Sequence, residues 1–196
     1  MGEQTVKAKA KRRELLHKIL DNLPDNDFES ITIKMICEAA DISVGTFYHY
    51  FGDKSGLIPE MFALMDDHVE YVIQPTLKND NALDDYMLFC HGIAAYMSSM
   101  HVSKVKLLYE FVPDFSSEIE ESRPFYQTAR RIIASGQEQG QIRLDINPNR
   151  IAQMTVIILR GYCYDWIRHE GAYDLIAYID CFSRLFIDSL RPFMPG

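Results

Sequence analysis

Small, hydroxyl-bearing and aromatic side chains gather at the end of the stretch formed by residues 32–54, which reads TIKMICEAADISVGTFYHYFGDK. Between residues 43 and 50 this stretch has no acidic residue, and Ser43, Val44, Thr46, Tyr48 and Tyr50 are available for an outer surface. Short hydroxyls can pair with base edges, a methyl group can meet thymine, and phenols can reach phosphate oxygens. These residue types therefore indicate contact with the major groove of DNA.

The apolar positions that must support this surface predict two short helices. Ile33, Ile36, Cys37 and Ala40 recur at helical spacing, and Thr32 precedes them as an N-cap candidate because its hydroxyl can accept from a free N–H one turn ahead.

The second helix has its own cap and its own inward face. Ser43 is the N-cap candidate, and Phe47 and Phe51 lie one turn apart, so both rings are expected to point inward. Because the two apolar stripes differ in phase, the helices should meet at an angle, as in a helix-turn-helix.

The motif T-x-x-x-I-x-x-x-A-x-I-S-x-G-T-F-Y-x-Y-F-x-x-K resembles the DNA-binding region of the tetracycline-repressor-like (TetR) family of bacterial transcription regulators. The resemblance implies an all-α protein of about nine helices. Its N-terminal three-helix helix-turn-helix domain (residues 1–53) would precede a helical ligand-binding and dimerisation domain (residues 54–196). The residues that the resemblance implies face DNA are Thr32, Ser43, Val44, Thr46, Tyr48, Tyr50 and Lys54, and His49 is a further candidate. Tyr48, Tyr50 and Lys54 would lie mostly at phosphates.

Two positions depart from the family pattern. Val44 stands where a polar residue is common, and it could meet a thymine methyl or no base at all. Asp41 occupies the turn where the family usually has glycine. Since aspartate tolerates the left-handed conformation better than most residues, the turn should survive.

The charge distribution favours DNA contact at one end of the chain. The 196 residues carry a net charge of −8, yet residues 1–20 hold six basic and two acidic side chains, a net charge of +4. Residues 57–196 hold 12 basic and 19 acidic side chains, a net charge of −7. The acidic residues 57–196 would repel DNA and the basic residues 1–20 would attract it, which helps to orient the protein on DNA.

Composition and the reactive residue types exclude several classes. The 47% hydrophobic and 12% aromatic content indicate a folded protein, and no apolar run reaches the roughly 18 residues of a membrane span, so we expect a cytoplasmic protein without a membrane partner. The four cysteines are far apart and are expected to be buried free thiols rather than metal ligands. The six histidines are scattered without a catalytic arrangement, so we expect neither an enzyme nor a cofactor.

Helical spacing continues through the rest of the chain. The expected helices span residues 7–22, 53–73, 84–100, 104–111, 116–138, 148–168 and 174–190. Asp53 is expected to cap the second of these, and Pro59 should bend it near residues 55–59 because it removes one backbone hydrogen bond. Pro124 is expected to kink or divide the 116–138 segment.

The last two expected helices need a partner. The helix over 148–168 is apolar nearly all round, so it must be covered on both sides. In the final helix one face would hold Leu175, Ile179, Phe182, Phe186 and Leu190, and another Ile176, Ser183 and Ile187. The simplest partner is a second copy, which gives a homodimer with a four-helix interface. Such a dimer could place two helix-turn-helix domains, called heads below, on a palindromic operator.

The family resemblance also implies control by an unidentified small molecule, hydrophobic or aromatic, that binds in the body. The candidate pocket residues are Tyr86, Phe89, Cys90, Ile93, Met97, Tyr109, Phe125, Tyr126, Tyr162 and Trp166, with His91, Arg160 and Asp165 as polar anchors. Aromatic residues and methionines at helical spacing also suit a plain hydrophobic core.

Two functional hypotheses follow from the sequence. The first is a homodimeric, sequence-specific transcription regulator, most simply a repressor, whose operator affinity a small molecule controls. The alternative is a regulator of the same fold whose head, with Val44 and little charge on its second helix, docks another protein instead of DNA.

Overall fold

A computed structural model describes residues 3–23, 30–78, 80–110 and 121–192 of the chain. Within these residues the regular structure is entirely helical, with nine α-helices, and the predicted all-α class is confirmed. The chain divides into an N-terminal unit, Met1–Leu64 with Ser103–Pro113, and a C-terminal unit, Met65–Val102 with Asp114–Gly196. This division falls later than residue 53, so the functional boundary there stays a prediction.

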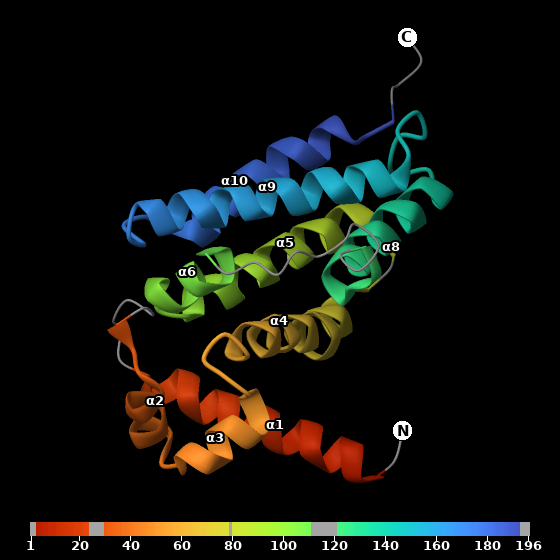
Figure 1. The fold of residues 1–196 in the computed structure, drawn as a ribbon. Helices are drawn as coiled ribbons and strands as arrows, with labels where there is room; N and C mark the ends of the chain where they lie inside the picture. The colour runs from red at the N-terminus through yellow and green to blue at the C-terminus, as the bar shows by residue number, and fades with distance from the viewer. Residues whose placement is uncertain (1–2, 24–29, 79, 111–120, 193–196) are drawn as a thin grey trace. The chain divides into compact units, whose positions relative to one another are not determined.

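The N-terminal unit is built on three helices that pack in sequence. Helix α1 (Glu3–Asn22) lies against α2 (Ile33–Ala40), and α2 lies against α3 (Val44–Phe51), as Figure 1 shows. Leu16, Ile19, Ile36 and Phe47 are fully buried and form the centre of this core. Helix α6 (Val102–Glu110) also belongs to this unit, apart from its first residue.

The predicted caps and turn of the helix-turn-helix are confirmed. The hydroxyl of Thr32 accepts from the Met35 N–H at 3.2 Å, and the hydroxyl of Ser43 accepts from the Thr46 N–H at 3.0 Å. Asp41 ends α2 in the left-handed conformation, with φ 52° and ψ 54°. The carboxylate-bearing residue thus takes the place that glycine would otherwise fill.

Helix α4 (Leu57–His68) begins one turn later than expected, so the prediction that Asp53 caps it is wrong. The Asp53 carboxylate instead accepts from the Ser55 hydroxyl at 2.6 Å and from the Gly56 N–H at 3.0 Å, which closes a turn before the helix. Pro59 consequently lies in the first helical turn, where its missing N–H leaves no bond unmade. Because residues 53–56 form a turn and the helix begins only at Leu57, the prediction that Pro59 bends the helix is wrong.

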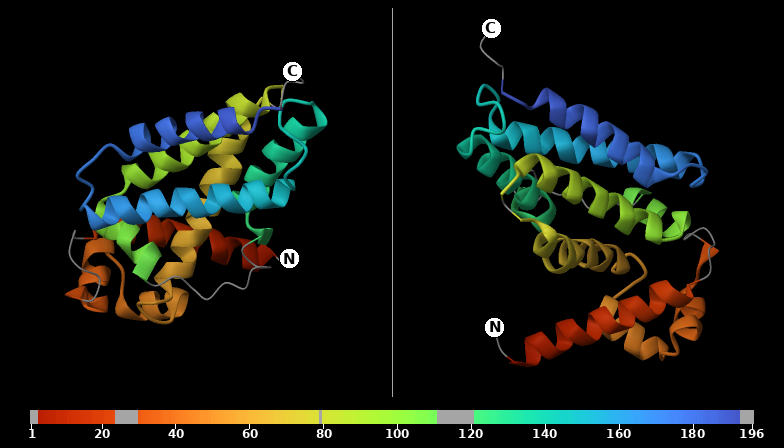
Figure 2. Two further views of the ribbon diagram at one scale, coloured as in Figure 1. Left: turned by 90° about the horizontal axis from the view of Figure 1, so that it is seen from above. Right: turned by 180° about the vertical axis from the view of Figure 1, so that it is seen from behind.

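Helix α5 (Ala82–Ser99) is the central element of the C-terminal unit. It packs against α10 (Leu175–Ser189) and α8 (Pro124–Glu138), and α8 packs against α9 (Pro148–Arg168), an arrangement seen from two further sides in Figure 2. Between α4 and α5 the chain forms a π-helical turn, η2 (Val69–Ile73), and a short 3-10 turn, η3 (Gln74–Thr76). The π-helical turn packs on both α5 and α8.

Pro124 is the first residue of α8, which confirms a division of the 116–138 segment at this proline. Proline suits this position because the first N–H groups of a helix have no intrahelical partner. The expected helical residues 116–120 lie outside the described part of the chain.

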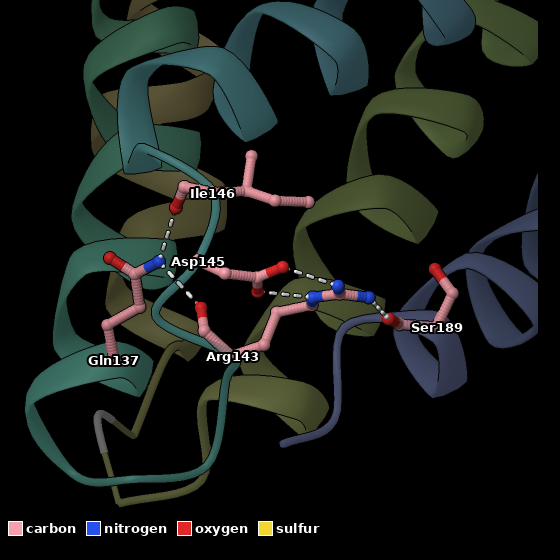
Figure 3. Close-up of polar contacts among 5 residues, drawn as sticks. All are labelled: Gln137, Arg143, Asp145, Ile146 and Ser189. Atoms are coloured by element: carbon pink, nitrogen blue, oxygen red, sulfur yellow. Dashed lines mark hydrogen bonds and ion pairs between the residues drawn. The ribbon is translucent and has the colours of Figure 1, made fainter. Parts of the chain in front are cut away.

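Arg143 fixes the connection between α8 and α9 (Figure 3). Its guanidinium pairs with Asp145 through two contacts of 2.6 Å and also donates to the Ser189 carbonyl at 3.3 Å. The Gln137 amide donates to the carbonyls of Arg143 and Ile146, each at 2.8 Å. The side-chain contact with Asp145 holds the pKa of that carboxyl below its usual value. The loop is therefore tied both to α8 and to the end of α10.

Cys37, Cys90 and Cys163 are buried free thiols as predicted, whereas Cys181 is exposed. The sequence prediction is wrong for Cys181 because this residue lies on the outer side of α10. Among the described residues, no group of three histidine, cysteine or acidic side chains could hold a metal ion, and no helix is long and apolar enough to cross a membrane.

Candidate nucleic-acid interface

The first turn of α3 holds its hydroxyl groups in fixed positions. Besides accepting from the Thr46 N–H, the Ser43 hydroxyl lies 2.8 Å from the Thr46 hydroxyl, and either oxygen can donate to the other. Whichever hydroxyl donates, the two together keep two acceptor positions and one proton, so an outside group could join without breaking the cap.

Opposite sides of α3 differ sharply in exposure. Phe47 is 0% exposed and its ring centre lies 5.3 Å from that of Phe51, so the predicted inward face is confirmed. On the outside, Val44 is 47% and Tyr48 51% exposed, and the two lie one turn apart. The outer face thus combines an aliphatic side chain with a phenol.

His49 and Tyr50 lie at the edge of this outer face. The His49 ring is exposed, and its centre lies 4.9 Å from that of the half-buried Tyr50 ring in an edge-on contact. The contact restricts both rings, and a restricted ring loses less conformational entropy when it binds.

Lys54, which is expected at phosphates, and Arg12, in the basic N-terminal segment, both have intramolecular partners. The Lys54 ammonium donates to the Ile31 carbonyl at 3.0 Å, and the Arg12 guanidinium pairs with Glu60 at 2.8 Å. The Lys54 contact holds the chain after α3 to the residue just before the α2 cap. An ammonium has three N–H groups, so this bond does not occupy its whole donor capacity.

Four of the predicted pocket residues lie together on one buried face of α5. Tyr86, Phe89, Cys90 and Ile93 are at most 2% exposed, and the Tyr86 hydroxyl lies 3.1 Å from that of Thr155. Burial raises the pKa of the Cys90 thiol to about 12, so it is neutral at physiological pH. Met97, Phe125 and Tyr126 are also buried in this unit.

The other predicted pocket residues do not join that face. Asp165 is exposed and accepts from the Tyr173 hydroxyl at 3.0 Å, while the Trp166 N–H donates to the Tyr173 carbonyl at 2.9 Å. Both therefore hold the turn between α9 and α10. Burial and the Asp165 contact raise the pKa of Tyr173 to about 12.

Three further candidates lie at the surface or edge of the C-terminal unit, and a fourth lies in the N-terminal unit. Tyr162 is half-buried beside Phe182, with ring centres 5.6 Å apart. His91 is exposed and contacts Asp180 at 3.0 Å, and Arg160 is exposed. Tyr109 belongs to the N-terminal unit.

An apolar stripe on α9 and α10 remains exposed, and sequence periodicity did not identify its members correctly. On α10 the residues predicted to form two faces are buried or half-buried, including Phe182 and Ser183. The stripe instead consists of Met154, Ile157, Gly161 and Tyr164 on α9 and Tyr178, Cys181 and Leu185 on α10. Ile157 and Leu185 are 66% and 69% exposed, which is unusual for large aliphatic side chains.

The capped helix pair with an uncharged outer face defines a helix-turn-helix protein of the kind that binds DNA. Residues 23–61 match the profile of the bacterial regulatory proteins of the tetR family. The helix-turn-helix region of the chain thus matches this family, and the resemblance predicted from the motif is confirmed.

Relatives cover nearly the whole chain at low identity. The chain is 23% identical to the probable acrEF/envCD operon repressor of Escherichia coli strain K12, over 94% of this chain and 87% of the relative. The fatty acid degradation regulator FadR of Bacillus halodurans has a similar fold, with a TM-score of 0.76 and 16% identity over 92% of this chain and 96% of that one. FadR of Bacillus subtilis, solved in complex with stearoyl-CoA, also has a similar fold, with a TM-score of 0.70 and 16% identity over 91% of this chain and 98% of that one. The family and these neighbours are transcription regulators.

Proposed function

We propose that this chain is a homodimeric, sequence-specific DNA-binding transcription regulator of the cytoplasm, acting as a repressor. The observation that carries the proposal is the outer face of α3, where Val44, Tyr48 and His49 are exposed beside the Ser43 and Thr46 hydroxyls. A helix inserted in the major groove needs such short, uncharged groups toward the bases and hydroxyls toward the phosphates. The E. coli relative, a probable operon repressor, supports the direction of control.

Dimerisation supplies the second DNA-binding head. The exposed stripe led by Ile157 and Leu185 would be covered by the same stripe of a second copy across a two-fold axis. Gly161 lies within this stripe, and a Cβ added there would meet no atom within 4 Å, so a partner helix could approach closely. Two heads joined in this way would read a palindromic operator with half-sites about 35 Å apart.

A small molecule bound in the C-terminal unit would control operator affinity. FadR of Bacillus subtilis, a transcriptional regulator of similar fold, was solved in complex with stearoyl-CoA, which supports an effector of the hydrophobic class for this chain. The buried face of α5 formed by Tyr86, Phe89, Cys90 and Ile93 is the proposed apolar part of its site. The effector would change DNA affinity only as far as it binds one head arrangement better than another.

Fluorescence anisotropy of the full chain with duplexes selected from a random library tests DNA binding. We expect affinity to fall steeply between 50 and 200 mM salt, because phosphate contacts release counterions on binding. Tyr48→Ala should weaken binding to all bound duplexes by about tenfold, the effect of one lost hydrogen bond to a charged group. Tyr71→Ala, which removes another exposed phenol outside the helix-turn-helix, is the matched control.

The alternative is a head that docks a protein through the same exposed Val44 and Tyr48. That hypothesis predicts no selected duplex and no salt-dependent binding, whereas a selected palindrome would exclude it.

A further inference from the structure

We propose that a concave surface along α8 is a binding site for a small polar oxyanion, such as the phosphate group of a sugar phosphate. The cavity holds about 510 Å³, which lies within the usual range for small-molecule sites of roughly 300–1,000 Å³. The residues that line it are Gln74, Gln127, Thr128, Arg130, Arg131, Ala134, Ser135 and Glu138. This set is separate from the apolar face of α5.

The chemistry of the lining selects a polar ligand. Apart from Ala134, every lining side chain carries a hydroxyl, an amide or a charge. An apolar ligand would leave these groups without water or partners, which costs free energy, whereas an oxyanion with neighbouring hydroxyls could pair with them.

Arg130 and Arg131 supply the positive charge. The Arg130 Nε donates to the Asn149 side-chain oxygen at 2.6 Å, which holds its guanidinium in place. Arg131 is exposed and, within the described residues, has neither a hydrogen-bond nor an ion-pair partner. A planar guanidinium can meet two oxygens of a phosphate or carboxylate at once.

Two small side chains give the cavity its depth. Ala134 and Ser135 follow Arg130 and Arg131 by one helical turn and therefore stand next to them on the same side of α8. Among the described residues of the lining, Glu138 is the only acidic one, and it could accept from hydroxyl groups on the ligand.

The base of the cavity joins α8 to the segment after α4. Thr128 is 1% exposed and its hydroxyl accepts from the Gln74 amide at 2.8 Å. Gln74 directly follows η2, so a ligand that contacts both residues would restrain the end of this connection. Oxyanion binding at this site does not depend on the proposed function. An effect of that binding on operator affinity rests on the proposed function.

Amide spectra of the full chain test the site with ribose 5-phosphate as the probe and neutral ribose as the matched control ligand, at constant ionic strength. We expect ribose 5-phosphate, but not ribose, to shift the amide signals of residues 127–138. Arg131→Gln should weaken this binding by about tenfold, because one charge-assisted contact is lost. Arg168→Gln makes the same charge change at an exposed position outside the cavity and should leave binding unchanged.

A second variant tests the shape of the site. Ala134→Leu fills the cavity without changing charge, and it should abolish the shifts while the unfolding temperature shows that the chain stays folded. Equal losses for Arg131→Gln and Arg168→Gln, or no shifts at all, would overturn the proposal. Inorganic phosphate that produces the same shifts would support the oxyanion as the recognised group.

A parallel anisotropy measurement separates this site from the proposed function. Ribose 5-phosphate that binds yet leaves operator affinity unchanged would overturn the regulatory link and preserve the site. Absence of DNA binding would overturn the proposed function, and the amide spectra would still decide the site.

Discussion

The outer face of α3 and the exposed stripe of α9 and α10 both lack the charges that usually cover a protein surface, but they differ in kind. The α3 face mixes Val44 with the phenol of Tyr48 and the imidazole of His49. The stripe is led by the larger aliphatic groups of Ile157 and Leu185, and it also carries the Tyr164 and Tyr178 phenols. Short polar side chains can exchange their bound water for the polar groups of another molecule, whereas large aliphatic side chains such as Ile157 and Leu185 gain free energy only when another apolar surface excludes water from them. The difference indicates two kinds of partner.

Removing a buried side chain of α3 should give the largest measured effect, a loss of stability in the N-terminal unit. Phe47→Ala removes a fully buried ring and should lower the free energy of unfolding of the N-terminal unit by about 3–5 kcal/mol. Thermal unfolding with amide exchange checks this. Tyr48→Ala, on the next residue, should change stability by no more than about 0.5 kcal/mol. Similar destabilisation by both variants would show that the two sides of α3 do not differ.

Charge on the aliphatic stripe should have the next largest effect. The double variant Ile157→Glu and Leu185→Glu buries charges in the proposed interface, and we expect dimer affinity to fall by at least about a hundredfold, roughly 3 kcal/mol. Sedimentation equilibrium measures this. Leu144→Glu is the control, because Leu144 is 76% exposed in the α8–α9 loop and outside the stripe. A double variant that remains a dimer would place the interface elsewhere.

Removal of the α3 cap should have a smaller effect. Ser43→Ala deletes the acceptor of the Thr46 N–H and should cost about 1 kcal/mol of stability in the N-terminal unit. Chemical denaturation followed by a probe in that unit measures the change. Ser43→Asn restores a capping acceptor and should recover most of the loss, and failure to recover it would show that the cap bond is not the cause.

A single methyl contact at Val44 should give the smallest effect. If Val44 meets a thymine methyl, replacing that thymine by deoxyuridine should weaken operator binding about fourfold, or roughly 0.8 kcal/mol. Val44→Ala should bind both duplexes equally. Anisotropy with matched duplexes gives the ratio, and a wild-type protein that is indifferent to the methyl would remove Val44 from base readout.

The sequence predicted the helix-turn-helix well because its determinants are local. The caps of Thr32 and Ser43 act over three residues, and the phase of Phe47 and Phe51 follows from one turn of helix. The start of α4 was predicted wrongly because the Asp53 carboxylate could cap either a helix or a turn. The close approach of Gly56 to the end of α3 favours the turn. A Cβ at Gly56 would lie 1.9 Å from the Phe51 carbonyl oxygen, so this turn needs the glycine.

The surfaces of the C-terminal unit depend on tertiary contacts and were less predictable. Helix α10 is apolar on several sides, so periodicity alone could not decide that Leu185 is exposed while Ile187 is buried. The cavity along α8 forms where Gln74, 57 residues before Arg131, meets Thr128. Only the adjacent arginines followed by small residues could have suggested it.

The backbone amide of Arg143, in the α8–α9 loop, can report on the opening of the C-terminal end of α10. The Arg143 N–H donates to the Leu190 carbonyl at 2.8 Å, just beyond the last residue of α10. This amide can exchange its hydrogen with solvent only when that contact opens. Its exchange rate therefore records how often the end of α10 frays, and comparison with amides in the middle of α5 would separate local fraying from unfolding of the whole unit.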